Sequence, residues 1–166
     1  MLAWAFAEPV LLFAARVAWG MPTLSETYIE NRQRVQPNHA NNYDSVHGGN
    51  LMKWMDEVGA MSAMRFAGEE IVTARMNRVD FERPIPVGDT ALIESYVYAA
   101  GHTSMRVRLR TFRENLRTRE RELTTESYFV YVAVDDDGHP MTVPDLAVDT
   151  DEGEELREAA LNGEEN

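Results

Sequence analysis

The chain has 166 residues, 44% of them hydrophobic and 27% charged, and it contains no cysteine. These values are ordinary for a soluble globular protein, and the length fits one compact domain with a sizeable core. The lack of cysteine excludes disulfide scaffolds, thiolate zinc sites and cysteine nucleophiles.

The formal net charge of −12 at pH 7 is unevenly distributed along the sequence. From Asp145 onward nine acidic residues accompany Arg157 alone, so the preceding sequence is only mildly acidic. A nucleic-acid-binding protein usually needs a basic face, and this composition indicates none, so we expect no nucleic-acid partner. Lys53 is the single lysine beside fifteen arginines, a composition typical of salt-tolerant (halophilic) organisms and equally of GC-rich genomes.

Residues 1–20 are almost entirely apolar, interrupted by Glu8, Pro9 and Arg16. A secretory signal would begin with positively charged residues, which are absent here. A membrane-spanning helix needs about 20 predominantly apolar residues, and the three interruptions lie inside the only candidate. We therefore expect an extension, or a true start at Met21, and a cytoplasmic protein without a membrane association. A membrane anchor is the less favoured alternative.

The first elements differ clearly in their pattern. Residues 27–36 alternate loosely and end at Pro37, which predicts a strand, and residues 37–49 are rich in Asn, Asp and Gly, which predicts an irregular connection. Residues 49–66 have helical periodicity and Gly68 follows as a stop. The predicted buried stripe comprises Leu51, Met52, Met55, Val58, Gly59, Ser62, Ala63 and Phe66. Most of these side chains are small or flexible, so this helix can lie deep against a sheet.

The rest of the domain is predicted to be antiparallel strands. The expected strands are residues 71–81, 90–99, 105–112 and 124–134, separated by turn-forming segments. One helix followed by such strands indicates an α+β domain, with the helix on one face of the sheet. We expect this domain over 21–144. The acidic tail over 145–166 is expected to be disordered, with room for a short helix over 152–161.

Candidate chemistry is concentrated between residues 37 and 59, where a polar loop leads through two glycines into the helix. Gly48 and Gly49 allow a ligand to approach the backbone, and free N–H groups at a helix N-terminus attract developing negative charge. This arrangement suits an oxyanion hole. Asp56 follows two turns later at the border of the apolar stripe, where a carboxylate must be paired, protonated or functional.

Each of these residues also has an ordinary structural explanation. A helix aspartate such as Asp56 is most often solvated or salt-bridged, and its neighbour Glu57 must point in a different direction. The glycine pair alone could be a plain turn. His47 alone is more often a packing residue, and Asn41 alone would hold a turn. The ordered combination of the four features carries the functional prediction.

That combination resembles the signature of the acyl-CoA thioesterases of the hotdog superfamily, the bacterial short- and medium-chain enzymes and the brain-type enzyme. The matching positions are Asn41, His47-Gly48-Gly49, Asp56 and Gly59. The resemblance continues through the segments 71–73, 80–89 and 129–135, and covers about residues 27–144. Asp44 departs from the pattern, because the family often has glycine between the asparagine and the Gly-Gly pair.

The resemblance implies a long central helix wrapped by an antiparallel sheet of five or six strands, and the hydrolysis of acyl-CoA thioesters to fatty acid and coenzyme A. Asp56 would act as general base or nucleophile, and Asn41 would hold the water or the carbonyl. The N–H group of Gly48 or Gly49, beside His47, would bind the oxyanion. No metal or cofactor is expected, since coenzyme A is part of the substrate.

The resemblance also implies a homo-oligomer, with a dimer as the catalytic unit and a trimer of dimers as a further arrangement. In such dimers the asparagine loop and the acid-bearing helix of one site come from different subunits. Arg83, Thr73 and Ser104 are candidates to bind the coenzyme A substrate, Arg83 through its phosphates. A row of arginines (Arg106, Arg108, Arg110) is expected to pair across a hairpin with Glu120, Glu122 and Glu126.

Two other functions remain open from the residues. A non-catalytic acyl-CoA-binding protein of the same fold would lack the acid, and the presence of Asp56 argues against it. A hotdog enoyl-CoA hydratase or dehydratase would use a histidine paired with an acid, and His47 and Asp56 lie nine residues apart. The surrounding pattern favours the thioesterase.

Overall fold

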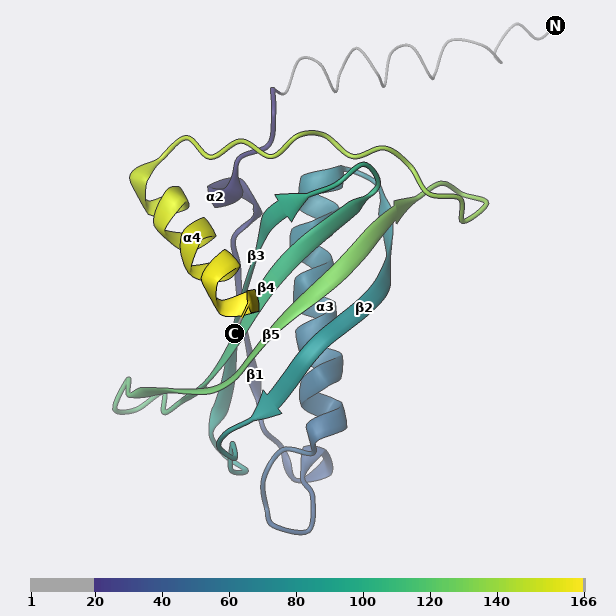
Figure 1. Cartoon of the computed structure of the whole chain (residues 1–166). Helices are drawn as coiled ribbons and strands as arrows, with labels where there is room; N and C mark the ends of the chain where they lie inside the picture. Colours follow the sequence, from purple (N-terminus) through teal and green to yellow (C-terminus); the bar gives the residue numbers. More distant parts are fainter. Residues whose placement is uncertain (1–19, 166) are drawn as a thin grey trace, which may run out of the picture.

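The computed structural model describes residues 20–165 (Figure 1). Its helices are α2 (Leu24–Thr27), the 3-10 turn η1 (Pro37–His39), α3 (Gly48–Ala67) and α4 (Asp151–Glu165), and its strands are β1 (Ile29–Arg34), β2 (Glu70–Phe81), β3 (Thr90–Ala100), β4 (Ser104–Glu114) and β5 (Arg121–Val134). The strands form one antiparallel sheet in the order β1-β3-β4-β5-β2, with α3 across one face. The α+β class, the long helix and the five-stranded sheet are confirmed.

The helix α3 begins and ends where the sequence predicts. The His47 side chain accepts a hydrogen bond from Gly49 N–H at the start, and Gly68 stops the helix with a φ of 66°, a left-handed value that glycine tolerates best. Seven of the eight predicted stripe residues are buried, and Met52 is half-buried. Serine hydroxyls join the two layers, since Ser62 Oγ lies 2.6 Å from Ser95 Oγ on β3.

The sheet register sets which side chains face α3. Thr73 on β2 lies opposite Tyr131 on β5, and Tyr131 lies opposite Met105 on β4. Residues opposite one another in an antiparallel pair share a face, so this row spans three strands on the helix side. A register shift between Thr73 and Arg75 marks a β-bulge directly beside this row. Such bulges bend a strand and re-aim its side chains.

Several predicted strand boundaries differ from the structure. The predicted strand over 27–36 is shorter, because Thr23 forms a capping box with Glu26 and starts the short helix α2, which takes residue 27. β5 begins at Arg121, three residues before the predicted start, because Arg121 and Glu122 continue the pairing with β4.

The acidic tail is ordered as a helix over Asp151–Glu165, where the sequence predicts disorder with a short helix at most. α4 lies on the face of the sheet opposite α3, against a second apolar cluster that includes Tyr96, Tyr98 and Ala160 (Figure 1). The Tyr96 hydroxyl donates to Leu156 O at 2.9 Å. These few apolar contacts order a segment whose composition is otherwise typical of disorder. Residues 1–19, most of the predicted extension, lie outside the described residues.

The predicted arginine ladder is confirmed at one position and wrong at two. Arg108 pairs with Glu126 at 2.9 Å as expected. Arg110 instead binds Glu94 on β3 at 2.7 Å. Glu94 and Glu126 both lie directly opposite Arg110 on its two neighbouring strands, and Glu126 is bound by Arg108. Arg106 reaches Glu164 of α4 at 2.6 Å, a partner that a disordered tail could not supply. Within residues 20–165 no helix is long and apolar enough to cross a membrane.

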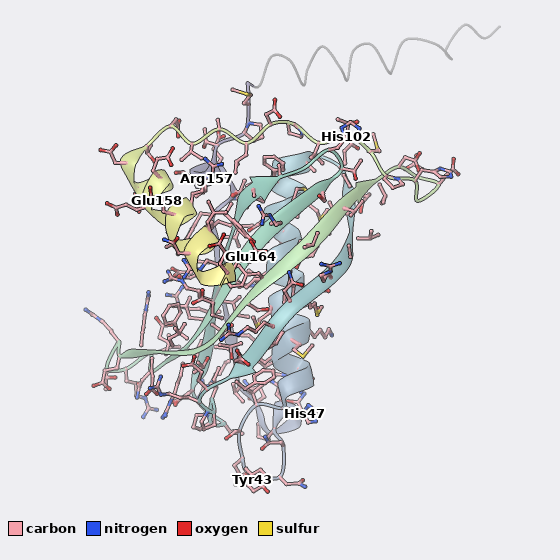
Figure 2. All side chains as sticks on the ribbon, viewed as in Figure 1. Tyr43, His47, His102, Arg157, Glu158 and Glu164 are labelled. Atoms are coloured by element: carbon pink, nitrogen blue, oxygen red, sulfur yellow. The ribbon has the colours of Figure 1, made fainter. Side chains whose placement is uncertain are left out.

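Replacing Ala160 with Asp is expected to detach α4 from the sheet. Ala160 is fully buried in the second cluster, and an unpaired carboxylate there costs about 2–3 kcal/mol or more. Hydrogen exchange should then lose amide protection over 151–165 while α3 keeps its protection. Glu158→Asp is the control, because Glu158 is exposed and points away from the sheet (Figure 2). Equal protection in both variants would contradict the docking of α4.

Candidate active site

Asp56 is half-buried on α3 and is bound by two side chains of the sheet. Thr73 Oγ1 donates to Asp56 Oδ1 at 2.7 Å. The Tyr131 hydroxyl lies 3.2 Å from the same Oδ1 and 3.1 Å from the backbone carbonyl oxygen of Asp56. Oδ2 has no protein partner within residues 20–165. The sheet therefore holds one carboxylate oxygen and leaves the other available for chemistry.

The neighbouring acid Glu57 differs from Asp56 in its exposure and in its partner. Its side chain is exposed and lies 3.8 Å from Lys53 in an ordinary ion pair one helical turn away. Surface pairs of this kind contribute little to stability. Of the two adjacent acids, the sequence analysis favours Asp56, and only Asp56 lies among groups that could orient it.

The Asn41 loop is a tight turn held by the asparagine itself. Asn41 Oδ1 accepts hydrogen bonds from the backbone N–H groups of Tyr43 at 2.8 Å and Ser45 at 3.3 Å. The Nδ2 group of Asn41 has no partner within the described residues, so the side chain can still donate. Asp44 has a φ of 54°, in the left-handed region that glycine favours and that aspartate tolerates better than most residues.

The loop is also tied to the segment that follows β2. Val46 N–H donates to Ile85 O at 2.8 Å, and Val87 N–H donates to Asp44 O at 2.9 Å. Ile85 is completely buried. The loop is therefore a fixed platform, and Tyr43 projects from its tip (Figure 2).

The two glycines at the start of α3 are not equivalent. Gly49 N–H donates to His47 Nδ1 at 3.0 Å, so it is already used by the helix cap. Gly48 N–H has no partner within residues 20–165. A Cβ built on Gly48 would contact the exposed ring of Phe81 at 3.4 Å. Gly48 is therefore the better candidate for an oxyanion donor, while His47 and Gly49 form the cap behind it.

The two halves of the candidate site are separated within one protomer. Gly48 and Asp56 are eight residues apart on one helix, which is about 12 Å along its axis. His47 lies at the N-terminal end of α3, and Tyr43 lies further out on the loop that precedes this helix (Figure 2). A single thioester carbonyl cannot contact both groups in one protomer. The candidate groups of one protomer thus fall into two separate sets, called below the acid half-site (Asp56 and its partners) and the loop half-site (the Asn41 loop and Gly48).

The predicted binding residues lie in three different environments. Thr73 is part of the acid half-site. Arg83 Nη1 donates to Leu123 O at 3.0 Å, and its Nε lies 3.1 Å from Glu122, so the half-exposed guanidinium already has partners. Ser104 lies opposite Val132, next to the inward-facing Tyr131 row, and so faces the side of the sheet away from α3. The structure does not bring Ser104 to Asp56.

The sequence analysis missed Tyr131. It treats residues 124–134 only as a strand, and nothing in that strand indicates which hydroxyl meets the helix. Alternation could have placed Tyr131 on the helix face together with Phe129 and Ala133, both fully buried. The contact with Asp56 depends on the helix position, which local patterns do not give.

One group of possible metal ligands occurs in the described part of the chain. Asp135, Asp137 and His139 place ligand atoms within 4.8 Å of one another in an exposed turn. Asp135 Oδ1 accepts the backbone N–H groups of Asp137 at 3.0 Å and His139 at 2.8 Å. These bonds explain the cluster as a turn after β5.

Comparisons with known proteins show the family to which the chain belongs. The family model of the thioesterase superfamily matches residues 43–120. The uncharacterized acyl-CoA thioester hydrolase YkhA of Bacillus subtilis is 38% identical over 136 residues, covering 82% of this chain and 79% of that protein. The chain therefore belongs to the thioesterase superfamily, and its fold is the hotdog fold.

Solved structures give the same result. An acyl-CoA hydrolase of Staphylococcus aureus, in complex with butyryl coenzyme A and coenzyme A, is 32% identical with a TM-score of 0.79, covering 86% of this chain and 87% of that chain. An apo-hexameric acyl-CoA thioesterase is 37% identical with a TM-score of 0.78, covering 87% of this chain and 92% of that chain.

Structures of the Staphylococcus aureus enzyme with alanine in place of an asparagine, an aspartate or a threonine are also similar to this chain. In that enzyme the aspartate follows the asparagine by 15 residues and the threonine follows the aspartate by 17. The same intervals separate Asn41, Asp56 and Thr73 in this chain.

If His47 acts only as the helix cap, its replacements should be graded by capping ability. His47→Ala removes the acceptor for Gly49 N–H and is expected to lower the free energy of unfolding by about 1 kcal/mol. His47→Asn supplies another good cap and should restore most of that loss in urea unfolding. Thioesterase activity should survive in His47→Asn. A fully folded but inactive His47→Asn variant would instead indicate that the imidazole takes part in chemistry.

Proposed function

We propose that the protein hydrolyses acyl-CoA thioesters to a fatty acid and coenzyme A, with Asp56 as the residue that activates water. The observation that carries this proposal is the Asp56 carboxylate, bound at Oδ1 by Thr73 and open at Oδ2. Membership of the thioesterase superfamily and the acyl-CoA hydrolase relatives support the substrate class. Coenzyme A is part of the substrate, and the scheme needs no cofactor.

In the preferred mechanism, Asp56 acts as a general base. Oδ2 removes a proton from water while the water oxygen attacks the thioester carbon, and the carbonyl oxygen becomes negatively charged. Collapse of this intermediate breaks the carbon–sulfur bond, and the proton passes to the departing thiolate. In the alternative, Asp56 attacks the thioester carbon itself and the carbon–sulfur bond breaks, which releases coenzyme A as a thiolate that takes a proton from water. A water molecule then hydrolyses the mixed anhydride to the fatty acid and restores the Asp56 carboxylate.

The developing oxyanion would be bound by the N–H group of Gly48, with Asn41 Nδ2 as a second donor. Loss of one such donor in other enzymes costs about 3–4 kcal/mol of transition-state stabilisation. Both groups belong to the loop half-site. Because that half-site lies about 12 Å from Asp56 in the same protomer, the loop of a second subunit would have to supply it.

A homo-oligomer with a dimer as its catalytic unit fits this requirement. β2 is an edge strand of the sheet and carries Thr73 of the acid half-site. Its exposed side chains include Val72, Met76 and Phe81, an apolar set that water would solvate poorly. Phe81 also lies beside Gly48. We propose that β2 lies at the dimer interface, and that three such dimers associate, since hexamers occur among the similar structures.

Among the remaining residues, Arg83 is our candidate for the coenzyme A phosphates, because half of its side chain is exposed despite the pairing with Glu122. Ser104 lies on the far face of the sheet from Asp56, so any contact with substrate would be with a distant part of coenzyme A. We propose a cytoplasmic enzyme.

Asp56→Asn should fold and still bind coenzyme A, but lose about 100-fold to 10,000-fold in kcat, the range that general-base catalysis usually contributes. The measurement is steady-state hydrolysis over a series of acyl-CoA chain lengths, with coenzyme A binding followed by calorimetry. Glu57→Gln is the matched control, because this neighbouring acid is exposed and should be dispensable. Full activity in Asp56→Asn would exclude the proposed mechanism.

Subunit sharing can be tested by complementation of two inactive variants. Asn41→Asp keeps the oxygen that holds the loop and replaces the free Nδ2 donor, whereas Asp56→Asn inactivates the other half-site. A mixed dimer then contains one site with both lesions and one intact site. Random pairing of equal amounts should recover about a quarter of wild-type activity. If co-expressed variants stay inactive despite verified mixed dimers, each site lies within one protomer.

A further inference from the structure

Tyr131 and Gly59 form an interlocking pair beside Asp56. The Tyr131 ring is completely buried between the sheet and α3, and its hydroxyl lies within hydrogen-bond distance of both Oδ1 and the backbone oxygen of Asp56. A Cβ built on Gly59 would collide with the Tyr131 hydroxyl oxygen and lie 3.1 Å from Cζ. The lack of a side chain at Gly59 is therefore what admits the hydroxyl.

The Tyr131 hydroxyl is well suited to remain a donor. Burial, and after it the negative charge of Asp56, raise the pKa of Tyr131 well above its usual range. The Tyr131 phenol therefore stays protonated at neutral pH. Its single proton can be directed to Asp56 Oδ1 or to the helix carbonyl, and both acceptors belong to the same residue.

We propose, on the basis of the function proposed above, that Tyr131 is a positioning residue that selects Asp56 Oδ2 as the oxygen that acts on water. Two hydroxyl groups, from Thr73 on β2 and Tyr131 on β5, converge on Oδ1. They fix the rotation of the carboxylate about its terminal bond, a torsion that otherwise has broad and nearly equal minima. In this role Tyr131 acts on the reaction through Asp56 alone.

A positioned base accelerates the chemical step more than it aids binding, since rate depends steeply on the geometry of the reacting groups. Tyr131→Phe removes only the hydroxyl and keeps the buried ring. We expect kcat to fall about tenfold, the low end for a hydrogen bond to a charged group, because Thr73 still holds Oδ1. KM should stay within about twofold, since an interaction felt only in the transition state changes kcat alone.

Tyr98→Phe is the matched control for this substitution. Tyr98 is also a fully buried strand tyrosine, but it belongs to the cluster on the other face of the sheet. It should keep its wild-type kcat. An equal loss in Tyr98→Phe, or an unchanged kcat in a folded Tyr131→Phe, would overturn the proposal. A rise in KM with constant kcat would do so as well.

The close contact between Gly59 and the Tyr131 hydroxyl supplies a second, independent test of the positioning role. Gly59→Ala should displace the Tyr131 hydroxyl and lower both kcat and thermal stability. Adding Tyr131→Phe removes the oxygen that collides, so the double variant should regain part of the lost Tm while its kcat stays at the level of Tyr131→Phe. A double variant that recovers wild-type kcat together with Tm would show that the hydroxyl has only a packing role.

Different results would contradict the proposed function of Asp56 and the proposed positioning role of Tyr131. If Asp56→Asn keeps full activity, the function proposed for Asp56 is wrong. If Asp56→Asn is inactive while Tyr131→Phe and the double variant turn over like the wild type, only the positioning role of Tyr131 is wrong.

Discussion

The close packing of α3 on the sheet determines the position of Asp56 and of the hydroxyl groups that bind it. The contact between the layers uses Gly59, Ser62 and Ala63, whose small size lets the helix axis approach the strands, and Ser62 bonds directly to Ser95. At the border of this contact the helix carries Asp56, too close to the sheet to be fully hydrated. Its charge is accommodated because Thr73 and Tyr131 present hydroxyl groups there.

The same helix separates the chemistry of one protomer into two places. Its N-terminus holds Gly48 beside the fixed Asn41 loop, and Asp56 lies two turns along, near the middle. A straight helix cannot bring these together, so the proposed mechanism requires a second copy of the chain. The exposed apolar residues of the edge strand β2 suggest where that copy binds. Catalysis and the association of the subunits would then both depend on the surface formed by β2.

Much of this arrangement is predictable from the sequence, for identifiable reasons. The α3 stripe has strong periodicity and clear end signals at His47 and Gly68, so its bounds and buried face are correct to within a residue. The spacing of Asn41, the glycine pair and Asp56 in the sequence predicts them as the candidate site residues. Thr73 is predicted at the site, but as a substrate ligand rather than as a partner of Asp56. The non-local contacts are missed: Tyr131 on Asp56, Glu94 on Arg110 and Glu164 on Arg106 depend on register and on α4 docking.

The most direct measurement is a crystal structure of the Asp56→Asn variant with an unhydrolysed acyl-CoA. We predict the thioester carbonyl between position 56 of one protomer and the Asn41 loop of the partner subunit, with its oxygen facing Gly48 N–H. The water should lie on the side of the former Oδ2, away from Thr73 and Tyr131. A thioester bound within one protomer, or remote from position 56, would contradict the shared site.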